Sequence, residues 1–422
     1  MGGDSVFRDG AAGILAGSTL YVCSLAIPML AYAVLSGRLA LHVRIAVALA
    51  TAGAFAALAA STLQDYAVTL AWVALGVGYL ALCAAGVFAA HRIRASVPVD
   101  HAAMFGLIGF FFVLVPAIAV PGAGRALVLL SGWEMMLAAY SFYVDAPASR
   151  KELRLRDCLV FIAVNPCLVL AESGRIAHAP QLSARGLRRI GLGAATLAVH
   201  ALLFSGIQVY SGLSDERFAR WPLLAEWPLL VLFYLGHVVL GVLVHSGRAS
   251  IQIGMMKLMG HELPERYDYP LAAKDPVDFW RRWNIYVGAW FRRYIFFPFT
   301  IKFPRLAGKK WRVLAVPMAV IVTFLACGVW HDFAIYARTG QFQPGVTIVF
   351  LLHGVLVIGW AAIAAALVRG ARQLPELRRA GVALSRVCFL PLLAILTWLV
   401  LPPLAGVGLH PALKQLLGWI AS

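Results

Sequence analysis

Polar and charged side chains gather in one aromatic segment of the chain, residues 275–298, with the sequence DPVDFWRRWNIYVGAWFRRYIFFP. Asp275 precedes Pro276, and Asp278 follows in the first turn. This is the arrangement of an N-cap, a proline at the first helical position and an acidic third position. We therefore predict one helix that begins at Asp275 and ends near Pro298.

The two faces of this predicted helix differ in chemistry. Arg281, Asn284, Gly288 and Arg292 share one face. The glycine leaves room beside two arginines and an amide, which suits a phosphate-bearing donor and a hydrogen bond to a reacting carbonyl. The other face is an aromatic stripe of Phe279, Trp283, Tyr286, Trp290, Tyr294 and Phe297.

An alternative function for the aromatic stripe is anchoring in the lipid headgroup region. Aromatic residues with arginines at their edges commonly hold a helix there. Arg282 and Arg293 lie at the edge of the stripe, and we expect them to extend toward headgroups. Anchoring alone does not explain the face that carries Asn284 and Gly288.

A second ionisable group lies in CGVWHD, residues 327–332, at the end of an apolar stretch. Histidines and carboxylates at membrane depth are costly and usually face a cavity. A neutral imidazole is a natural general base, and the adjacent Asp332 is a candidate to orient His331 or raise its pKa. Taken singly, a histidine at a helix end is also compatible with a satisfied or interfacial residue.

The elements that must position these residues are long and apolar. The 422 residues are 61% hydrophobic and only 13% charged, whereas soluble domains are roughly 45–50% apolar and about 25% charged. The mean hydropathy is +0.82. These values exclude a soluble globule and predict an all-α polytopic membrane protein with a single domain over residues 1–422. Ten stretches are long enough to span the bilayer: 11–36, 45–62, 67–90, 102–120, 126–144, 190–210, 223–245, 313–330, 345–368 and 386–403.

The positions of the basic residues predict the orientation, and they matter more than the net charge of +17. With the N-terminus outside, most of the 36 Lys and Arg residues fall in the connections 37–44, 91–101, 145–189, 246–312 and 369–385. These connections are then cytoplasmic by the positive-inside rule. The short stretch 157–171 is interrupted by Asn165 and Pro166, so we predict a re-entrant or interfacial segment.

Other classes of site find little support in the sequence. The N-terminus lacks the basic start of a signal peptide, so the first apolar stretch is expected to stay as a spanning helix. The six cysteines show no paired spacing, and we interpret them as packing residues. No P-loop, dinucleotide fingerprint or serine elbow is present in the right context, and no metal, bound cofactor or nucleic-acid partner is expected.

Two motifs together resemble the membrane-bound O-acyltransferase (MBOAT) family. They are FWRRWN at 279–284, continuing into WFRRYIFFP at 290–298, and GVWHD at 328–332. The similarity is strongest over the motif region 265–335, and weaker in SFYVD at 141–145. The pattern is most similar to the bacterial branch that acylates cell-wall polymers and exopolysaccharides, as in alginate O-acetylation and teichoic acid D-alanylation.

The resemblance implies a fold and a chemistry. It implies helices and re-entrant segments around a central tunnel, where a cytoplasmic acyl thioester meets an acceptor hydroxyl at membrane depth. His331 matches the family's catalytic histidine, and Asn284 matches its second polar position. Arg281 and Arg292 are then candidates to bind the phosphates of coenzyme A or of a carrier-protein phosphopantetheine.

The acceptor is the part of the prediction that stays open. The polysaccharide branch usually has histidine where this chain has Asn284, and asparagine is typical of members that acylate lipids or proteins. Asp332 stands where a small residue usually follows the histidine. We expect an acyltransferase of the bacterial inner membrane that moves a short acyl group to an extracytoplasmic glycan, with an accessory envelope protein as a possible partner. A lipid or protein acceptor, an anion transporter and an inactive scaffold are the alternatives.

Two further polar residues in the predicted spans have no assigned role. Glu134 is a carboxylate near the middle of a span, which makes it a candidate cavity residue without a visible partner. His353 lies in the span that follows His331, and we favour packing or hydrogen bonding for it.

Overall fold

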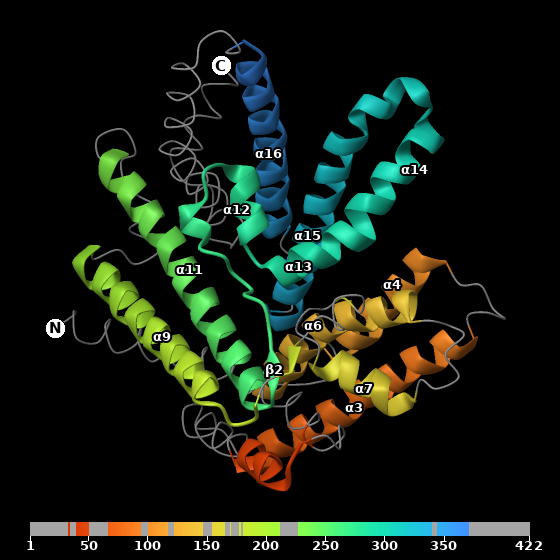
Figure 1. The fold of residues 1–422 in the computed structure, drawn as a ribbon, viewed down its shortest axis with the longest axis vertical. Helices are drawn as coiled ribbons and strands as arrows, with labels where there is room; N and C mark the ends of the chain where they lie inside the picture. The colour runs from red at the N-terminus through yellow and green to blue at the C-terminus, as the bar shows by residue number, and fades with distance from the viewer. Residues whose placement is uncertain are drawn as a thin grey trace.

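A computed structural model describes residues 33, 39–49, 66–93, 100–116, 122–146, 154–164, 169, 177–178, 180–211, 227–339 and 344–370 (Figure 1). These parts of the chain are mostly helical, as predicted. Nearly all of the predicted span 11–36, most of 45–62, the Asn165 and Pro166 break, the span 386–403 and the segment 404–422 lie outside the described residues.

Helices of the first half of the chain lie at the positions of four predicted spans and at the start of the short segment 157–171. The long α6 packs against α3, α4 and α7. The bounds of these helices, together with a π-helical turn η1, are α3 Tyr66–Ile93, α4 His101–Gly109, η1 Phe110–Leu114, α6 Gly122–Asp145, α7 Leu155–Val164 and α9 Ala184–Ser211.

The described residues of the second half of the chain contain three long helices, of which α11 packs against α9 and α15 packs against α16, and several short helices. Figure 1 shows α12 and α13 near the middle of the molecule, with α11, α15 and α16 around them. The bounds are α11 Trp227–Leu258, η2 Pro270–Ala272, α12 Pro276–Arg282, α13 Ile285–Phe291, η3 Arg292–Phe296, α14 Phe297–Ala307, η4 Lys309–Leu314, α15 Ala315–Thr339 and α16 Gly345–Gly370.

A two-residue β-ladder connects the two halves of the chain. Strand β1 Ala177–His178 pairs antiparallel with β2 His261–Glu262, with Ala177 opposite Glu262. The ladder fixes the start of the long connection after α11 beside the segment that precedes α9. Each strand has only two residues, which is too short for a sequence pattern to indicate the pairing.

The protein is an integral membrane protein with several helices of spanning length. By length and composition, four helical segments in the described residues can cross a bilayer: Ala184–Phe204, Val238–Leu258, Lys309–Phe333 and Gly345–Ala366. Helix α11 continues to Leu258, so the connection predicted to begin at residue 246 begins after a further stretch of helix.

Helices α9 and α11 approach each other through glycines. A Cβ atom on Gly193 would lie 2.7 Å from the carbonyl oxygen of Gly247, and one on Gly254 would lie 2.9 Å from that of Gly186. Side chains at these positions would separate the helices. Small residues allow such close backbone contact in membrane helices, where dispersion contacts replace the hydrophobic effect as the driving force.

The main core surrounds α6 and includes Trp290 of the aromatic stripe. Leu137, Ala138 and Ala139 of α6 are fully buried. Trp290 of α13 is 1% exposed, and its Nε1–H donates a 2.9 Å hydrogen bond to the carbonyl oxygen of Leu137. Tyr286 is 2% exposed. Phe279, Tyr286 and Trp290 therefore pack inside the protein, which excludes the headgroup-anchor alternative for these three residues, whereas Phe297 is 54% exposed.

The helix predicted over residues 275–298 is broken in the structure. Helix α12 ends at Arg282, Trp283 is extended, and Asn284 adopts a left-handed backbone with φ 39° and ψ 62°. The prediction was wrong at this point and again at its end, because Pro298 lies in the first turn of α14 and the chain stays helical to Ala307. The predicted N-cap is confirmed, since Asp275 Oδ1 accepts from the Asp278 N–H at 2.7 Å.

Candidate active site

A cavity of about 460 Å³ brings the predicted site residues together. Asn284 and His331, which the chain separates widely, both line it, and so do Arg281, Gly288 and Arg292. The remaining wall is largely apolar: Val277, Trp280, Trp283, Val287, Phe291, Phe296, Val320, Thr323, Phe324, Cys327, Phe350 and Val357. Such a pocket, apolar with a few convergent polar groups, is the usual form of a small-molecule site.

The tautomer of His331 follows from its hydrogen bond. Nδ1 lies 2.7 Å from the carbonyl oxygen of Cys327, one turn earlier in α15. A carbonyl oxygen only accepts, so Nδ1 carries the proton in the neutral ring. The lone pair is then on Nε2, which leaves this nitrogen able to accept a proton from a molecule in the cavity.

Aromatic rings hold the imidazole of His331 from several sides. Phe350 of α16 stacks on it at 4.8 Å between ring centroids, and Trp133 of α6 meets it edge to face at 5.4 Å. Trp133 also stacks on Trp330 at 3.8 Å and donates from Nε1 to the Trp330 carbonyl oxygen at 2.9 Å. Helices α6, α15 and α16 therefore fix the position of one side chain together.

Asp332 has a different partner from the one that its sequence position indicated. It is fully buried, and its carboxylate accepts from the N–H groups of Val346 and Thr347 at 3.0 Å each and from the Thr347 hydroxyl at 2.5 Å. These groups form the first turn of α16, so Asp332 caps that helix from α15. The Cys327 carbonyl, and not this carboxylate, accepts the His331 hydrogen bond.

Asn284 lies at the break between α12 and α13. Backbone hydrogen bonds on both sides of it hold this part of the chain against the loop before η2. The Ile285 N–H donates to the Arg266 carbonyl oxygen at 2.8 Å, and the Asp268 N–H donates to the Arg282 carbonyl oxygen at 3.0 Å. Asparagine tolerates the left-handed conformation better than most residues. The break turns the Asn284 side chain out of the regular helix surface and into the wall of the cavity.

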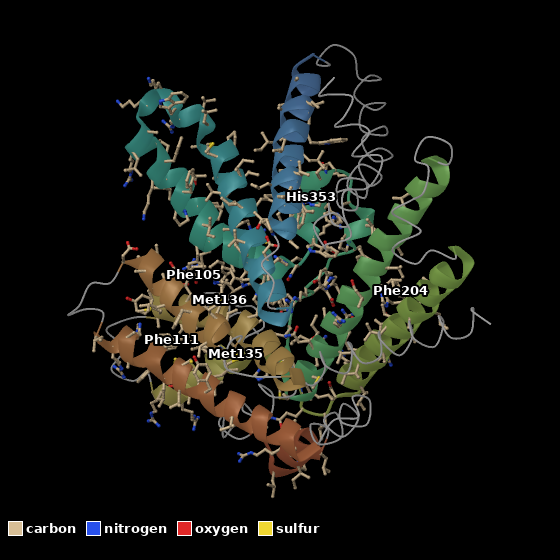
Figure 2. All side chains as sticks on the ribbon, turned by 180° about the vertical axis from the view of Figure 1, so that it is seen from behind. Phe105, Phe111, Met135, Met136, Phe204 and His353 are labelled. Atoms are coloured by element: carbon tan, nitrogen blue, oxygen red, sulfur yellow. The ribbon has the colours of Figure 1, made fainter. Side chains whose placement is uncertain are left out.

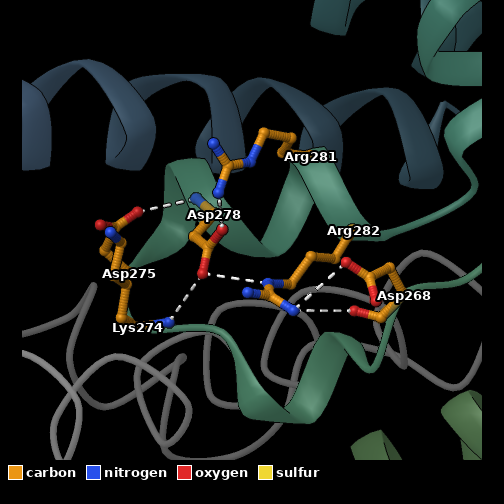
Figure 3. Close-up of polar contacts among 6 residues, drawn as sticks. All are labelled: Asp268, Lys274, Asp275, Asp278, Arg281 and Arg282. Carbon is orange, nitrogen blue, oxygen red and sulfur yellow. Dashed lines mark hydrogen bonds and ion pairs between the residues drawn. The ribbon is translucent and has the colours of Figure 1, made fainter.

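Arg281, in the last turn of α12, lies at the rim of the cavity and forms an ion pair within the same helix. Its side chain is 68% exposed, and Nη2 contacts Asp278 Oδ1 at 2.5 Å (Figure 3). Burial acts to raise the pKa of the Asp278 carboxyl, but hydrogen bonds from Arg281, the Lys274 N–H and Arg282 outweigh it and hold this pKa below its ordinary value. A charged Asp278 orients Arg281 and leaves most of the guanidinium exposed.

Gly288 and Arg292 lie together on the wall of the cavity. A Cβ atom on Gly288 would lie 3.3 Å from Arg292 Nη1. The missing side chain therefore leaves space beside the arginine on the cavity wall.

The two arginines expected to reach headgroups instead form ion pairs within the protein. Arg282 contacts Asp278 at 3.0 Å and Asp268 at 3.4 Å (Figure 3). Arg293 forms a bidentate pair with Asp145 of α6 at 2.9 and 3.1 Å, which raises the pKa of Arg293. The prediction that these arginines extend toward headgroups was wrong. Asp145 and Asp268 are distant in the chain, and Asp278 lies one turn before Arg282 in α12.

Sequence reasoning missed the partner of Glu134. Its carboxylate accepts from Arg266 Nη2 at 2.6 Å, and Arg266 is buried, with 6% of its surface exposed. The only available signal was a carboxylate in an apolar helix, which implies a buried cation somewhere in the fold. His353 is also buried, and its ring packs 5.4 Å from that of Trp280, in agreement with the packing role (Figure 2).

The sequence of this region matches a known family. Residues 165–357, which include α9, α11 to α16 up to Val357 and every predicted site residue, match the model of the membrane-bound O-acyltransferase family. Over these residues the chain is similar to an MBOAT domain. The resemblance inferred from the two motifs is confirmed.

Individual relatives agree with the family. The chain is 28% identical to a teichoic acid D-alanyltransferase of Bacillus subtilis over 130 residues, 30% of each chain. It is 29% identical to a probable alginate O-acetylase of Pseudomonas fluorescens over 86 residues, 20% of this chain and 16% of the relative. It is 31% identical to a probable long-chain-alcohol O-fatty-acyltransferase of Arabidopsis thaliana over 114 residues, 26% of this chain and 33% of the relative. These matches span a third or less of each relative's length.

Proposed function

We propose that this MBOAT protein transfers a short acyl group from a cytoplasmic thioester to a hydroxyl of an extracytoplasmic polysaccharide or cell-envelope glycan. One observation carries the proposal: Asn284 and His331 line the same cavity, and the Cys327 carbonyl holds His331 in the tautomer that leaves Nε2 free of a proton. A general base and an amide donor facing one apolar space are what acyl transfer to a hydroxyl requires.

The reaction proceeds by direct transfer in this proposal. His331 Nε2 accepts the proton of the acceptor hydroxyl as the oxygen bonds to the thioester carbonyl carbon. The Asn284 amide donates a hydrogen bond to the carbonyl oxygen, which becomes negatively charged. The tetrahedral intermediate then expels the thiolate, and the imidazolium returns its proton to the sulfur. The products are an ester and a free thiol, and His331 regains its starting tautomer.

Arg281 and Arg292 bind the donor in this proposal. Both line the cavity, and the exposed guanidinium of Arg281 is at its rim. Arginine forms paired charge-assisted hydrogen bonds with phosphate oxygens, so coenzyme A and a phosphopantetheine-bearing carrier protein both fit. The predominantly apolar wall between the arginines and His331 suits the uncharged thioester end of such a donor.

The acceptor is proposed on the basis of the bacterial relatives, whose names specify teichoic acid and alginate. Asn284 and the fatty-acyltransferase relative favour a second candidate, a lipid or protein hydroxyl. For a glycan acceptor, we propose that the protein acts in the bacterial inner membrane and works with an accessory envelope protein.

The proposal is tested with membranes that contain the wild-type protein and radiolabelled acetyl-coenzyme A, with longer acyl-coenzyme A donors in parallel. Label in the glycan fraction supports the first candidate, and label in the lipid or protein fraction supports the second. If neither acyl-coenzyme A nor acylated carrier protein gives transfer into any fraction, with neighbouring envelope proteins co-expressed, the proposed function is wrong.

A further inference from the structure

A buried arginine in the loop before η2 contacts three side chains from distant parts of the chain. Arg266 Nε donates to Asn284 Oδ1 at 3.0 Å, and Nη1 donates to Gln252 Oε1 of α11 at 2.9 Å. Nη2 contacts Glu134 Oε1 of α6 at 2.6 Å. One guanidinium therefore joins α6, α11 and the break between α12 and α13.

The contact with Asn284 fixes which way its amide points. Arginine has only donors, so the atom that faces Arg266 must be the amide oxygen. The NH2 group of Asn284 is then directed away from Arg266, and Asn284 lines the cavity that also contains His331. A charged donor on the amide oxygen also polarises the amide and makes its N–H groups stronger donors.

The backbone of Arg266 acts at the same place. Its carbonyl oxygen accepts from the Ile285 N–H at 2.8 Å, directly after Asn284. The left-handed conformation of Asn284 is therefore held on one side by the main chain of Arg266 and on the other by its side chain.

We propose that Arg266 is the positioning residue of the site, which holds the Asn284 amide with its N–H groups toward the reacting carbonyl. Glu134 and Gln252 hold Arg266 in turn, which gives the intramembrane carboxylate of α6 a role. Because Arg266 is 6% exposed, its charge needs these partners to be tolerated in the interior. The predicted effect of Arg266 on kcat rests on the proposed function. Its effect on the backbone conformation between α12 and α13 can be measured without an activity assay.

The kinetic test uses Arg266→Lys, which keeps the charge opposite Glu134 but lacks the planar fork that reaches Asn284 and Gln252 simultaneously. We expect kcat to fall about 10- to 100-fold, since misplacing a reacting group by about 1 Å costs on this order. KM for the donor should stay within about twofold, because the lost interaction belongs to the transition state. Arg189→Lys is the matched control: Arg189 pairs with Glu265, the neighbour of Arg266, and contacts neither Asn284 nor the cavity.

A double-mutant cycle separates positioning from general stability. If Arg266 acts through Asn284, Arg266→Lys has no further effect on kcat in an Asn284→Ala background. An equal fold-loss in both backgrounds would show that Arg266 has only a structural role and would overturn the inference.

Hydrogen exchange gives a readout that needs no activity. The Ile285 N–H bonds to Arg266, and the Gly288 N–H bonds to Asn284 at 2.9 Å, so Arg266→Lys should speed exchange over residues 283–288. Arg189→Lys should leave exchange there unchanged. If wild type transfers no acyl group, the proposed function fails, and this experiment alone decides the inference. Unchanged exchange over 283–288 in Arg266→Lys would contradict it.

Discussion

The carboxylate next to His331 is predicted to hold a helix and not to orient the imidazole. Asp332 accepts two N–H groups and one hydroxyl from the first turn of α16, at 2.5–3.0 Å. Asp332→Ala removes all three hydrogen bonds. Loss of a cap costs about 0.5–2 kcal/mol, and leaving a buried donor unsatisfied costs about 1–3 kcal/mol. We therefore expect destabilisation of about 2–4 kcal/mol for this variant.

Asp332→Asn separates the two roles. Asparagine keeps one acceptor oxygen for α16 but gives up the negative charge at its N-terminus, which is worth about 0.5–2 kcal/mol. The variant should unfold at a lower temperature than wild type but at a higher one than Asp332→Ala. Its rate of acyl transfer per folded molecule should stay within about threefold of wild type, since the histidine keeps its hydrogen bond to Cys327.

Thermal unfolding in a single detergent at a fixed heating rate measures the loss of stability. Transfer assays on the monodisperse fraction measure the rate of acyl transfer per folded molecule. A carboxylate that orients a catalytic histidine through its charge costs about 10⁴ in kcat when it is changed to the amide. If Asp332→Asn unfolded like wild type and lost activity to that extent, our assignment of Asp332 as a helix cap would be refuted.

Two further predictions concern stability. The pKa of Asp278 lies below its ordinary value of 3.8, so its charge stabilises the fold at neutral pH and this contribution is lost as the pH falls through the lowered pKa. Asp278→Asn should therefore lower the unfolding temperature at pH 7, and its deficit relative to wild type should shrink once the pH falls below 3.8; a deficit independent of pH would argue against the charge. Gly193→Val should destabilise the protein by about 1–3 kcal/mol, because its Cβ would lie 2.7 Å from the Gly247 oxygen. The control Gly191→Ala, where nothing lies within 4 Å, should be neutral or slightly stabilising in the same unfolding assay.

Local patterns predicted those parts of the fold that depend on neighbouring residues. Apolar length located the helices α3, α4, α6, α9, α11, α15 and α16, because spanning helices must be apolar over most of their length. The Asp275 cap followed from residue types within a single turn. The motif resemblance also selected Asn284 and His331, and the structure places both in one cavity.

Contacts between distant segments decided what the sequence could not predict. The aromatic stripe looked like a lipid anchor until Trp290 was seen to donate to Leu137 of α6. The predicted straight helix is broken because the Arg266 loop binds Asn284 and Ile285, and hydrogen bonds across the fold replace those of a regular helix. In hindsight, an asparagine in the middle of the predicted helix marked a position able to adopt the left-handed conformation.

The orientation of His331 was also set by a group that composition does not reveal. The neighbouring Asp332 was the obvious candidate, but a main-chain carbonyl one turn away accepts the hydrogen bond. Every residue carries such a carbonyl, so residue types alone cannot distinguish it.

The most direct test of the central claim compares acyl transfer by wild type, His331→Gln and Asn284→Ala, with His200→Gln as a control. His200 is buried on α9, where its ring packs against that of Phe204, and it does not line the cavity. We predict that His331→Gln loses about 10²–10⁴ in kcat and Asn284→Ala about 10²–10³, while His200→Gln transfers at the wild-type rate. Transfer by His331→Gln at the wild-type rate would contradict the account.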